Sequence, residues 1–409
     1  MIKSIIETLK CCGCEACVQV CPKQCIIMKE NPHGFMFPTI NTKECIKCGL
    51  CERSCPAIIK TKPVSPYATY AGFNLDKKIR MASSSGGVFA AIAEHIIKEN
   101  GVVFGARWNN KHELIHSYTE TLEGVHEFLG SKYLQSKIGY SYQEAESFLR
   151  LGRKVLFSGT PCQILALKLF LKKEYQNLIT VDFICHGVPS PGVFRWYLQE
   201  EINKLAKIKK TELNSIPSQL HLPYNYKIGG IFFRDKRLGW KKYSFVLNII
   251  VQKRHNHIRN IQLSQSLRKN PYLKGFIHNL YLRPSCYNCP VKKLKSGSCI
   301  TIGDFWGVNS IIPGIDDDSG VSAIIINSKN AEHLIAGLQL EKVDFKDLCR
   351  CNSAISKSST RNPFSDYFWQ LSNLSFSKRI KIIFKPDSHE VITKIKTIFF
   401  KLKTKVCNI

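Results

Sequence analysis

The sequence predicts an α/β (or α+β) domain that follows a small, cysteine-rich N-terminal domain. Three observations support this prediction. Two matching runs of four cysteines lie within residues 11–56, short apolar strands alternate with helices from residue 67 onward, and hydrophobic residues make up 44% of the chain. The chain has 409 residues, which suggests roughly two to four domains with enough apolar material for a sizeable core.

The two N-terminal cysteine runs share one spacing. They are Cys11, Cys14, Cys17, Cys21 with Pro22, and Cys45, Cys48, Cys51, Cys55 with Pro56. This spacing is typical of bacterial two-cluster ferredoxins, in which the fourth cysteine of each run binds the other cluster. We therefore expect a ferredoxin-like domain with two [4Fe-4S] clusters. Cys11, Cys14, Cys17 and Cys55 would bind one cluster, and Cys45, Cys48, Cys51 and Cys21 the other.

Zinc and structural disulfides are the alternatives for these eight cysteines. Zinc takes pairs of cysteines that close one tetrahedral site, and two identical runs ending in Cys-Pro do not have that form. Cys12 and Cys25 fall outside the spacing. We interpret both as residues that bind no cluster.

Strands and helices alternate after residues 59–66, a stretch whose two prolines and two lysines indicate a linker. Strands are expected at residues 67–73, 101–107, 154–158, 178–184 and 321–327, and helices at 88–98 and 142–151. A further helix is expected to follow residues 159–162 and to continue to residue 171, and a hairpin is expected within 228–252. Alternation of this kind predicts parallel strand pairing.

Four later cysteines form a second candidate set: Cys162, Cys185, Cys286 and Cys289. Cys162 falls at a predicted helix N-terminus, which stabilises a thiolate. Cys162 and Cys185 both follow predicted strands, and α/β sheets place their sites at the carboxyl ends of strands. The four could ligate a third cluster. Alternatively, Cys162 and Cys185 are apolar core residues, or the set binds zinc.

With these cysteines in place, the chain resembles the beta-subunit family of coenzyme F-420 hydrogenases and dehydrogenases, in the form fused to a two-cluster ferredoxin. The matching segments are Ser84–Gly87, Gly130–Tyr133 with Gln135 and Ser136, Gly159–Gln163, Cys185–Pro191, Arg283–Cys289 and Gly303–Gly307. The resemblance implies an α/β (or α+β) catalytic domain carrying FAD or FMN and one [4Fe-4S] cluster of its own. It also implies electron transfer between clusters and a two-electron carrier such as the deazaflavin coenzyme.

The resemblance gives domain bounds and leaves open whether Cys299 is a ligand of the third cluster. Residues 1–60 are the ferredoxin-like domain, 61–150 and 151–345 resemble the family's N-terminal and C-terminal regions, and 346–409 form a basic helical tail. Cys299 stands where the family usually has an acidic residue, so Cys299 could replace one of the four later cysteines as a cluster ligand.

The candidate flavin site combines residues from several segments. The predicted cofactor-binding residues are Ser84, Ser85, Gly86, Gly87, Ser131, Lys132, Tyr133, Gly159, Thr160 and Asp304. The serine–glycine stretch could hold a flavin phosphate at a helix N-terminus, or form an ordinary capped turn. Lys132, Tyr133 and Asp304 could contact the cofactor, or belong to a surface loop and a turn. His186 is the predicted catalytic residue, a proton relay, with a structural histidine as the alternative.

The charge and the tail bear on partners and location. The formal net charge is +28, which favours acidic redox partners, anionic cofactors or anionic lipid; no nucleic-acid motif accompanies it. Residues 389–406 have the pattern of a basic amphipathic helix, which could pack on the protein or lie on a membrane. We expect no secretory signal and no membrane-spanning helix, hence a cytoplasmic protein, with peripheral contact at the inner membrane face as a second option.

Two functions follow from the sequence. The first is an iron–sulfur flavoprotein oxidoreductase that passes electrons between clusters and a two-electron carrier. The second is a ferredoxin-type electron-transfer subunit without its own substrate site, which could serve polysaccharide synthesis. In both cases the partner is a redox protein or a two-electron carrier, and the substrate is left open.

Overall fold

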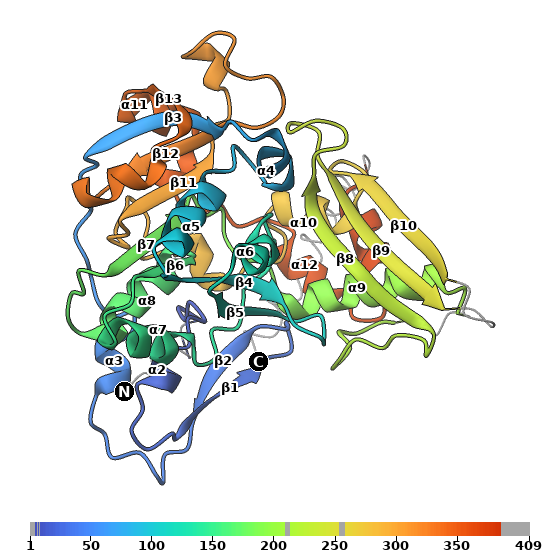
Figure 1. Cartoon of the computed structure of the whole chain (residues 1–409). Coiled ribbons are helices and arrows are strands. Elements are labelled where there is room, and N and C mark those ends of the chain that lie inside the picture. The colour runs from blue at the N-terminus through green and yellow to red at the C-terminus, as the bar shows by residue number, and fades with distance from the viewer. Residues whose placement is uncertain (1–4, 6, 8, 209–212, 253–257, 386–409) are drawn as a thin grey trace, which may run out of the picture.

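A mixed sheet of eight strands forms the centre of the part of the chain that the structure describes (Figure 1). In this computed structural model that part comprises residues 5, 7, 9–208, 213–252 and 258–385. The strand order is β13 (Leu338–Lys342), β3 (Ala68–Asn74), β12 (Ser322–Ile326), β11 (Ile300–Asp304), β7 (Leu178–Phe183), β6 (Val155–Gly159), β4 (Val102–Trp108) and β5 (Leu114–Thr119). The four strands β11, β7, β6 and β4 are parallel, and the flanking pairs are antiparallel. The predicted α/β class is confirmed.

Helices cover both faces of this sheet because its central strands are apolar on both sides. Val102 and Phe104 of β4 pack with α7 (Ser141–Arg150) and α8 (Pro161–Leu171). Val103, between them, packs with α5 (Val88–Lys98) and α6 (Leu122–Phe128) on the other face. Successive side chains of a strand point to opposite faces, so one strand supplies both cores.

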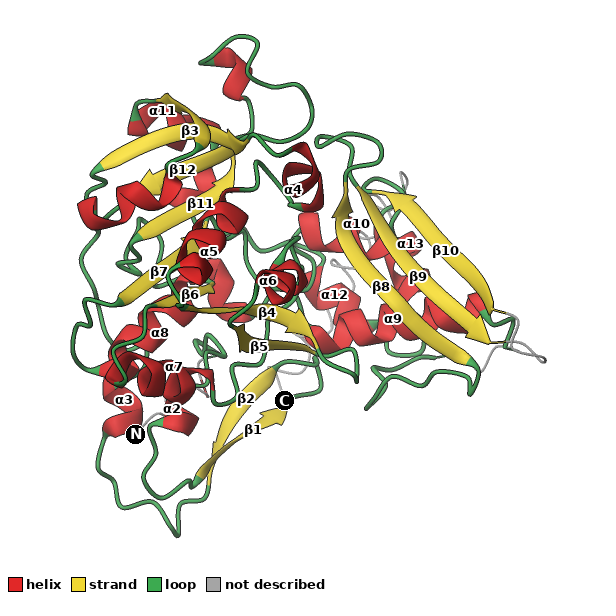
Figure 2. Cartoon of the chain, viewed as in Figure 1, coloured by secondary structure: helices red, strands yellow, loops and turns green. Residues whose placement is uncertain are grey.

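A second sheet of three antiparallel strands lies beside the first (Figure 2). Its strands are β8 (Tyr226–Asp235), β9 (Ser244–Gln252) and β10 (Ile258–Ser266), in the order β10-β9-β8. One face packs on α9 (Pro191–Leu205), α10 (Pro271–Ile277), α12 (Ser365–Gln370) and α13 (Phe376–Ile383). Aromatic side chains, including Phe233, Phe245 and Tyr272, fill the layer between them.

The structure adds two features to the sequence prediction. The hairpin expected within residues 228–252 is present as β8 and β9, and β10 joins it as a third strand whose mostly polar, exposed residues carried no strand signal. In the C-terminal region, α11 (Phe345–Cys351) and the helices α12 and α13 are described, with Phe368 and Phe376 buried in the core. The amphipathic segment predicted at residues 389–406 lies outside the described residues.

The N-terminal domain consists of short elements held on the large domain. They are α2 (Ala16–Gln19), the antiparallel hairpin β1 (Ile26–Glu30) and β2 (Met36–Ile40), and α3 (Leu50–Arg53). Tyr142 of α7 donates a hydrogen bond to the carbonyl of Cys14, and the amide of Gly139 donates one to Glu15. The first cysteine loop is therefore fixed by the large domain rather than only by its own turns.

Arg283 makes the most extensive of these contacts. Its side chain is 1% exposed and donates hydrogen bonds to the carbonyls of Cys11 (3.1 Å) and Met36 (2.8 Å) and to Oε1 of Gln135 (2.8 Å). The amide of Gln135 in turn donates to the carbonyl of Cys12 at 2.6 Å. The guanidinium also lies near the rings of Phe35 and Phe37. Arg283 thus satisfies backbone acceptors in both the first cysteine loop (Cys11) and the hairpin (Met36) of the N-terminal domain.

Replacing Arg283 tests this anchor. Arg283→Met leaves three buried acceptors without a donor, and each costs about 1–3 kcal/mol when unsatisfied. We expect the free energy of unfolding to fall by about 2–5 kcal/mol, as measured by guanidinium denaturation followed through iron–sulfur absorbance. Arg150→Met is the control, because the ion pair of Arg150 with Glu146 lies on the exposed side of α7. Equal denaturation midpoints for the two variants would contradict the anchoring role.

Candidate functional site: three cysteine sets and an adjoining cavity

The second N-terminal cysteine run opens at the protein surface. Cys45, Cys48 and Cys51 line a pocket of about 160 Å³ together with Cys21, the residue expected to complete this set. Cys48 is exposed and the others are partly buried. Cys25, which we interpreted as a residue that binds no cluster, also lines this pocket, and its Sγ lies 3.5 Å from that of Cys21. The sequence did not predict that proximity.

The cysteines of the first set are buried together. Cys11, Cys17 and Cys55 belong to one core cluster, and Cys14 is 8% exposed. Burial raises the pKa of Cys14, Cys17 and Cys55, and the charges of the neighbouring cysteines raise it further. Four thiols that repel one another as thiolates suit a cationic iron cluster, which supplies the positive charge they lack.

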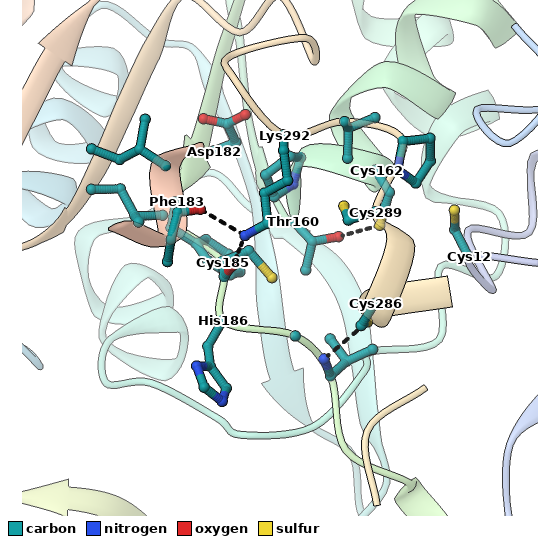
Figure 3. A pocket seen from close by; sticks show the side chains of 18 of the residues that line it. Cys12, Thr160, Cys162, Asp182, Phe183, Cys185, His186, Cys286, Cys289 and Lys292 are labelled. Atoms are coloured by element: carbon teal, nitrogen blue, oxygen red, sulfur yellow. Dashed lines mark hydrogen bonds between the residues drawn. The ribbon is translucent and has the colours of Figure 1, made fainter. Parts of the chain in front are cut away.

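A third group of cysteines lines a pocket of about 50 Å³ between the two domains (Figure 3). Cys162 lies in the first turn of α8, Cys185 follows β7, and Cys286 and Cys289 belong to or follow the 3-10 helix η2 (Pro284–Asn288). The structure therefore brings together the four residues that the sequence predicted as a set. Among the described residues, no three His, Cys, Asp or Glu side chains gather as ligands of one metal ion. A [4Fe-4S] cluster instead binds one thiolate at each of four irons.

Local hydrogen bonds hold three of these four cysteines. Thr160 caps α8 through a capping box with Gln163, and its hydroxyl lies 3.1 Å from Sγ of Cys162. The amide of Val188 donates to Sγ of Cys286 at 3.5 Å. Lys292 donates from Nζ to the carbonyl of Cys185 at 2.6 Å and places a positive charge at the pocket wall.

Cys12 is the fifth cysteine of this pocket, and no pattern in the sequence indicated its presence there. In Figure 3, Cys12 belongs to the N-terminal segment and lies on the side of Cys162 that is away from Cys185. Its hydrogen bond with Cys162 lowers the pKa of Cys162 to about 7, and the hydroxyl of Thr160 contributes to the same shift. Because Cys12 is next in sequence to Cys11, the first N-terminal set and the third set are neighbours in space.

Cys299 lies outside all three sets. Its amide donates to the carbonyl of Thr180 at 2.9 Å, and its side chain packs at the edge of the core cluster formed by α5 and α6. It does not line the pocket that holds Cys162 and Cys185. Its place is that of a core residue beside β7.

A cavity of about 660 Å³ adjoins the third cysteine pocket. This size is in the range of small-molecule and cofactor sites. Most predicted cofactor-binding residues line it: Ser84, Ser85, Gly87, Ser131, Lys132, Tyr133, Gly159, Thr160 and Asp304, together with His186. Gly86 does not line it, because its amide donates to Oγ of Ser322 inside the wall and any side chain would meet the carbonyl of Gly72.

The serine-rich loop forms one end of the cavity. Gly87, with a φ of 83°, is the N-cap residue of α5, so this helix N-terminus has no side-chain cap, and the first residues of α5 line the cavity. Free amides at a helix N-terminus bind anions such as phosphate. The hydroxyl of Ser84 accepts a hydrogen bond from the amide of Ser131, which joins the two predicted segments. This end of the cavity suits a phosphate-bearing cofactor.

Lys132 and Tyr133 occupy the cavity wall in different ways. Nζ of Lys132 donates to the carbonyls of Glu127 (2.8 Å) and Leu129 (2.9 Å), so two of its three donors bind the end of α6. Burial lowers the pKa of Lys132 to about 7. The ring of Tyr133 packs against Phe276 at 4.6 Å. Tyr133 thus offers an aromatic surface, whereas the direct phosphate contact predicted for Lys132 is limited by its own hydrogen bonds.

The cysteine pocket and the cavity share a wall. Thr160, residues 183–188 and Ala354 line both. Within this wall, His186 follows Cys185 directly and faces the cavity, and its Nε2 lies 2.5 Å from Oδ1 of Asn279. Any group bound in the cavity would therefore lie next to a cluster bound by the cysteines.

Several aromatic and charged residues of the cavity were not among the predicted site residues. Arg234 of β8, Tyr243 before β9 and Trp306 after β11 all line it. For Arg234 and Tyr243 the available signal was a charged and aromatic stretch, residues 234–243, between two apolar strands, and Trp306 lies in the matching segment Gly303–Gly307. Such a stretch does not reveal which of its residues point inward.

The fold and the cysteine sets define an iron–sulfur redox protein with a role in electron transfer, and two of its regions match known protein families. Residues 10–59 match the 4Fe-4S dicluster domain, and residues 152–348 match the C-terminal region of the coenzyme F420 hydrogenase/dehydrogenase beta-subunit family. Residues 152–348 of the chain are thus similar to this family, and a dicluster domain precedes them. The resemblance found in the sequence is confirmed.

Individual relatives match parts of the chain. An uncharacterised protein of Methanocaldococcus jannaschii is 27% identical over 207 residues, which are 42% of this chain and 56% of that protein. Ferredoxin-1 of Caulobacter vibrioides is 45% identical over 53 residues, 12% of this chain and 42% of its own length. The chain thus spans about half the length of the curated relatives it matches.

A solved structure of an F420-reducing [NiFe] hydrogenase complex from Methanosarcina barkeri contains a chain that is similar at 13% identity. The match has a TM-score of 0.41 and covers 83% of this chain and 96% of that one. Within the described ranges, no helix of this protein combines the length and apolar character needed to cross a membrane.

Single cysteine substitutions test the third set. Cys185→Ser or Cys289→Ser removes one proposed ligand, and we expect iron to fall by about four atoms per chain while the ferredoxin-type clusters remain. Iron analysis and electron paramagnetic resonance of the reduced protein measure this loss. Cys299→Ser is the matched control and should retain full iron content. Equal iron content in all variants would remove these cysteines from the set of ligands.

Proposed function

We propose that this protein is an iron–sulfur flavoprotein oxidoreductase with three [4Fe-4S] clusters and one flavin, FAD or FMN. The observation that carries the proposal is the wall shared by the third cysteine pocket and the large cavity. A cluster behind this wall and a flavin in front of it would lie close enough for direct electron transfer. The substrate is a two-electron carrier, of which the deazaflavin coenzyme is the one that the family suggests.

The cysteine sets would form an ordered path. The set with Cys48 is the one nearest the solvent, so a redox partner protein would exchange electrons there. The buried set with Cys11 follows, and Cys12 connects it to the third pocket. A flavin supplies the chemistry that joins one-electron clusters to two-electron carriers. The order is the same for either direction of electron flow.

The cavity residues fit a flavin at both ends. The uncapped N-terminus of α5 and the serine loop would bind the phosphate, and Tyr133 and Phe276 would contact the ring system. Gly159 and Thr160 lie where β6 ends and α8 begins, next to Cys162. They would separate the ring system from the cluster by only a short stretch of backbone.

His186 is the proposed proton relay. The amide nitrogen of Asn279 donates to the carbonyl of Thr360 at 2.8 Å, which fixes Oδ1 of Asn279 as the atom that faces His186. Nε2 of His186 therefore carries a proton and donates it in this hydrogen bond. Nδ1 is then the nitrogen that can accept a proton in the cavity. Burial lowers the pKa of His186 and favours this neutral form.

Cofactor content tests the proposal. In protein purified anaerobically, we expect about twelve irons, about twelve acid-labile sulfides and one flavin per chain. Iron and sulfide assays and the absorption spectrum measure these values. About eight irons without flavin would instead support a two-cluster relay protein that has no substrate site of its own.

The role of His186 has its own test. We expect His186→Gln to lower the turnover of a two-electron acceptor by about 10²-fold or more, because general acid–base groups contribute about 10²–10⁴-fold. Iron and flavin content should stay at the wild-type level. His278→Gln is the control, since His278 packs on Phe384 outside the cavity wall. Wild-type turnover for His186→Gln would assign this histidine a structural role.

A further inference from the structure

The guanidinium of Arg234 is a buried charge of the cavity that its own surroundings do not satisfy. Arg234 belongs to β8, its side chain is 3% exposed, and it lines the cavity. Burial is the largest single influence and lowers the pKa of Arg234, but the carboxylate of Asp304 together with Tyr133 and Tyr243 raises the pKa above its ordinary value. The side chain therefore stays cationic in an interior site, where charges require partners.

Asp304 satisfies only one corner of this guanidinium. Nη1 of Arg234 donates to Oδ2 of Asp304 at 2.5 Å, and Oδ1 of Asp304 accepts from the indole nitrogen of Trp240 at 3.0 Å. Nε and Nη2 of Arg234 are buried and have no acceptor among the residues that the structure describes. A buried donor without an acceptor costs about 1–3 kcal/mol, and more when it is charged.

The two unsatisfied atoms form one edge of the guanidinium. Nε–H and Nη2–H point in parallel, so they can donate two hydrogen bonds to the two oxygens of one carboxylate or phosphate. Such bidentate pairs are among the strongest hydrogen bonds that arginine forms. The rings of Tyr243 and Trp306 lie 4.6 and 5.4 Å from the guanidinium carbon and hold it in place. The site is thus a preformed fork that fits an oxyanion.

The surrounding charge also favours an anion. Lys236, two residues further along, donates from Nζ to the carbonyls of Arg80, Ser85 and Ser319. Burial, and then the positive charges of Arg234 and Arg80, lower the pKa of Lys236 to about 7. Two carboxylates, Asp304 beside Arg234 and Asp317 beside Arg80, balance only part of the positive charge of these three residues. A ligand that brings negative charge to this end of the cavity would relieve the repulsion.

We propose that the Nε–Nη2 edge of Arg234 binds an oxyanion, a carboxylate or a phosphate, of the ligand that fills the cavity. The inference rests on the proposed function, because that oxyanion belongs either to the flavin phosphate or to an anionic two-electron substrate. Since both atoms are buried, the oxyanion reaches them when a neighbouring ring shifts. Trp306 is 36% exposed and Tyr243 6%, so Trp306, whose inner face stacks on Trp240, is the more accessible of the two rings.

The test compares Arg234→Met with wild type in two titrations of the full chain. In the first, FMN and riboflavin are added to flavin-free protein, and their fluorescence reports binding. In the second, inorganic phosphate and acetate are added to flavin-loaded protein, and tryptophan and flavin fluorescence report binding. Arg237→Met is the matched control, because Arg237 is on the same strand–turn segment but pairs with Asp235 and Gln262 at the surface.

Each result has a defined meaning. If FMN affinity falls about 10–100-fold and riboflavin affinity does not, Arg234 binds the flavin phosphate. If both flavins bind as in wild type but phosphate or acetate binding weakens by a similar factor, Arg234 binds the substrate's oxyanion. Unchanged binding of all four probes would overturn the inference. If wild type binds no flavin, the proposed function fails, and phosphate titration of wild type against Arg234→Met still decides the anion site.

A second comparison guards against misfolding. Arg234→Met leaves Asp304 buried without its partner, so the double variant Arg234→Met/Asp304→Asn and the single variant Asp304→Asn are measured as well. The asparagine of these variants retains an acceptor for Trp240 without a charge. If the double variant binds the probe more weakly than the single variant Asp304→Asn by the same factor, the role of Arg234 is supported. If the two variants bind the probe equally well, that role is contradicted. Arg234→Lys keeps the charge without the fork, and its partial recovery would show that the two parallel donors matter.

Discussion

The hydrogen bonds of Arg283 are the interaction on which the relation between the two domains depends. This side chain is buried and donates to carbonyls of the cysteine loop and the hairpin, while its backbone leads directly to Cys286 and Cys289. The same few residues therefore fix the N-terminal domain and supply two of the proposed ligands of the third set. A shift of the anchor would change the spacing between neighbouring sites, because the connecting segment is only a short, tight 3-10 turn.

The three cysteine sets differ in how deeply they are buried. Cys48 is exposed, the set around Cys11 is buried, and the cysteines of the third set are partly buried where Cys12 of the N-terminal domain meets the large domain. Solvent exposure and nearby charges are among the factors that set the potential of an iron–sulfur cluster. Clusters in these three sets would therefore differ in potential, because the sets differ in burial and Lys292 lies beside only the third.

The sequence predicted what depends on local spacing and missed what depends on long-range contacts. The eight N-terminal cysteines follow a local repeat, and the helix at residues 88–98 follows an apolar period, so both were predictable. Cys12 acquires its neighbours only because the N-terminal domain docks on α8. Gly86 is diverted from the cavity by Ser322, which is 236 residues away. Arg234 meets Asp304 only through the packing of two separate sheets.

Strand direction explains why these distant residues meet at one edge of the large sheet. The parallel strands β6, β7 and β11 end there with Gly159, Phe183 and Asp304. The antiparallel strand β12 begins at the same edge, since Ser322 pairs with Asp304, and β3 ends there because Gly72 pairs with Ser322. The serine loop follows β3, and Cys162 and Cys185 follow β6 and β7. In an open α/β sheet this edge is the common place for a site, and here the antiparallel neighbours extend it into a cavity large enough for a cofactor and its substrate.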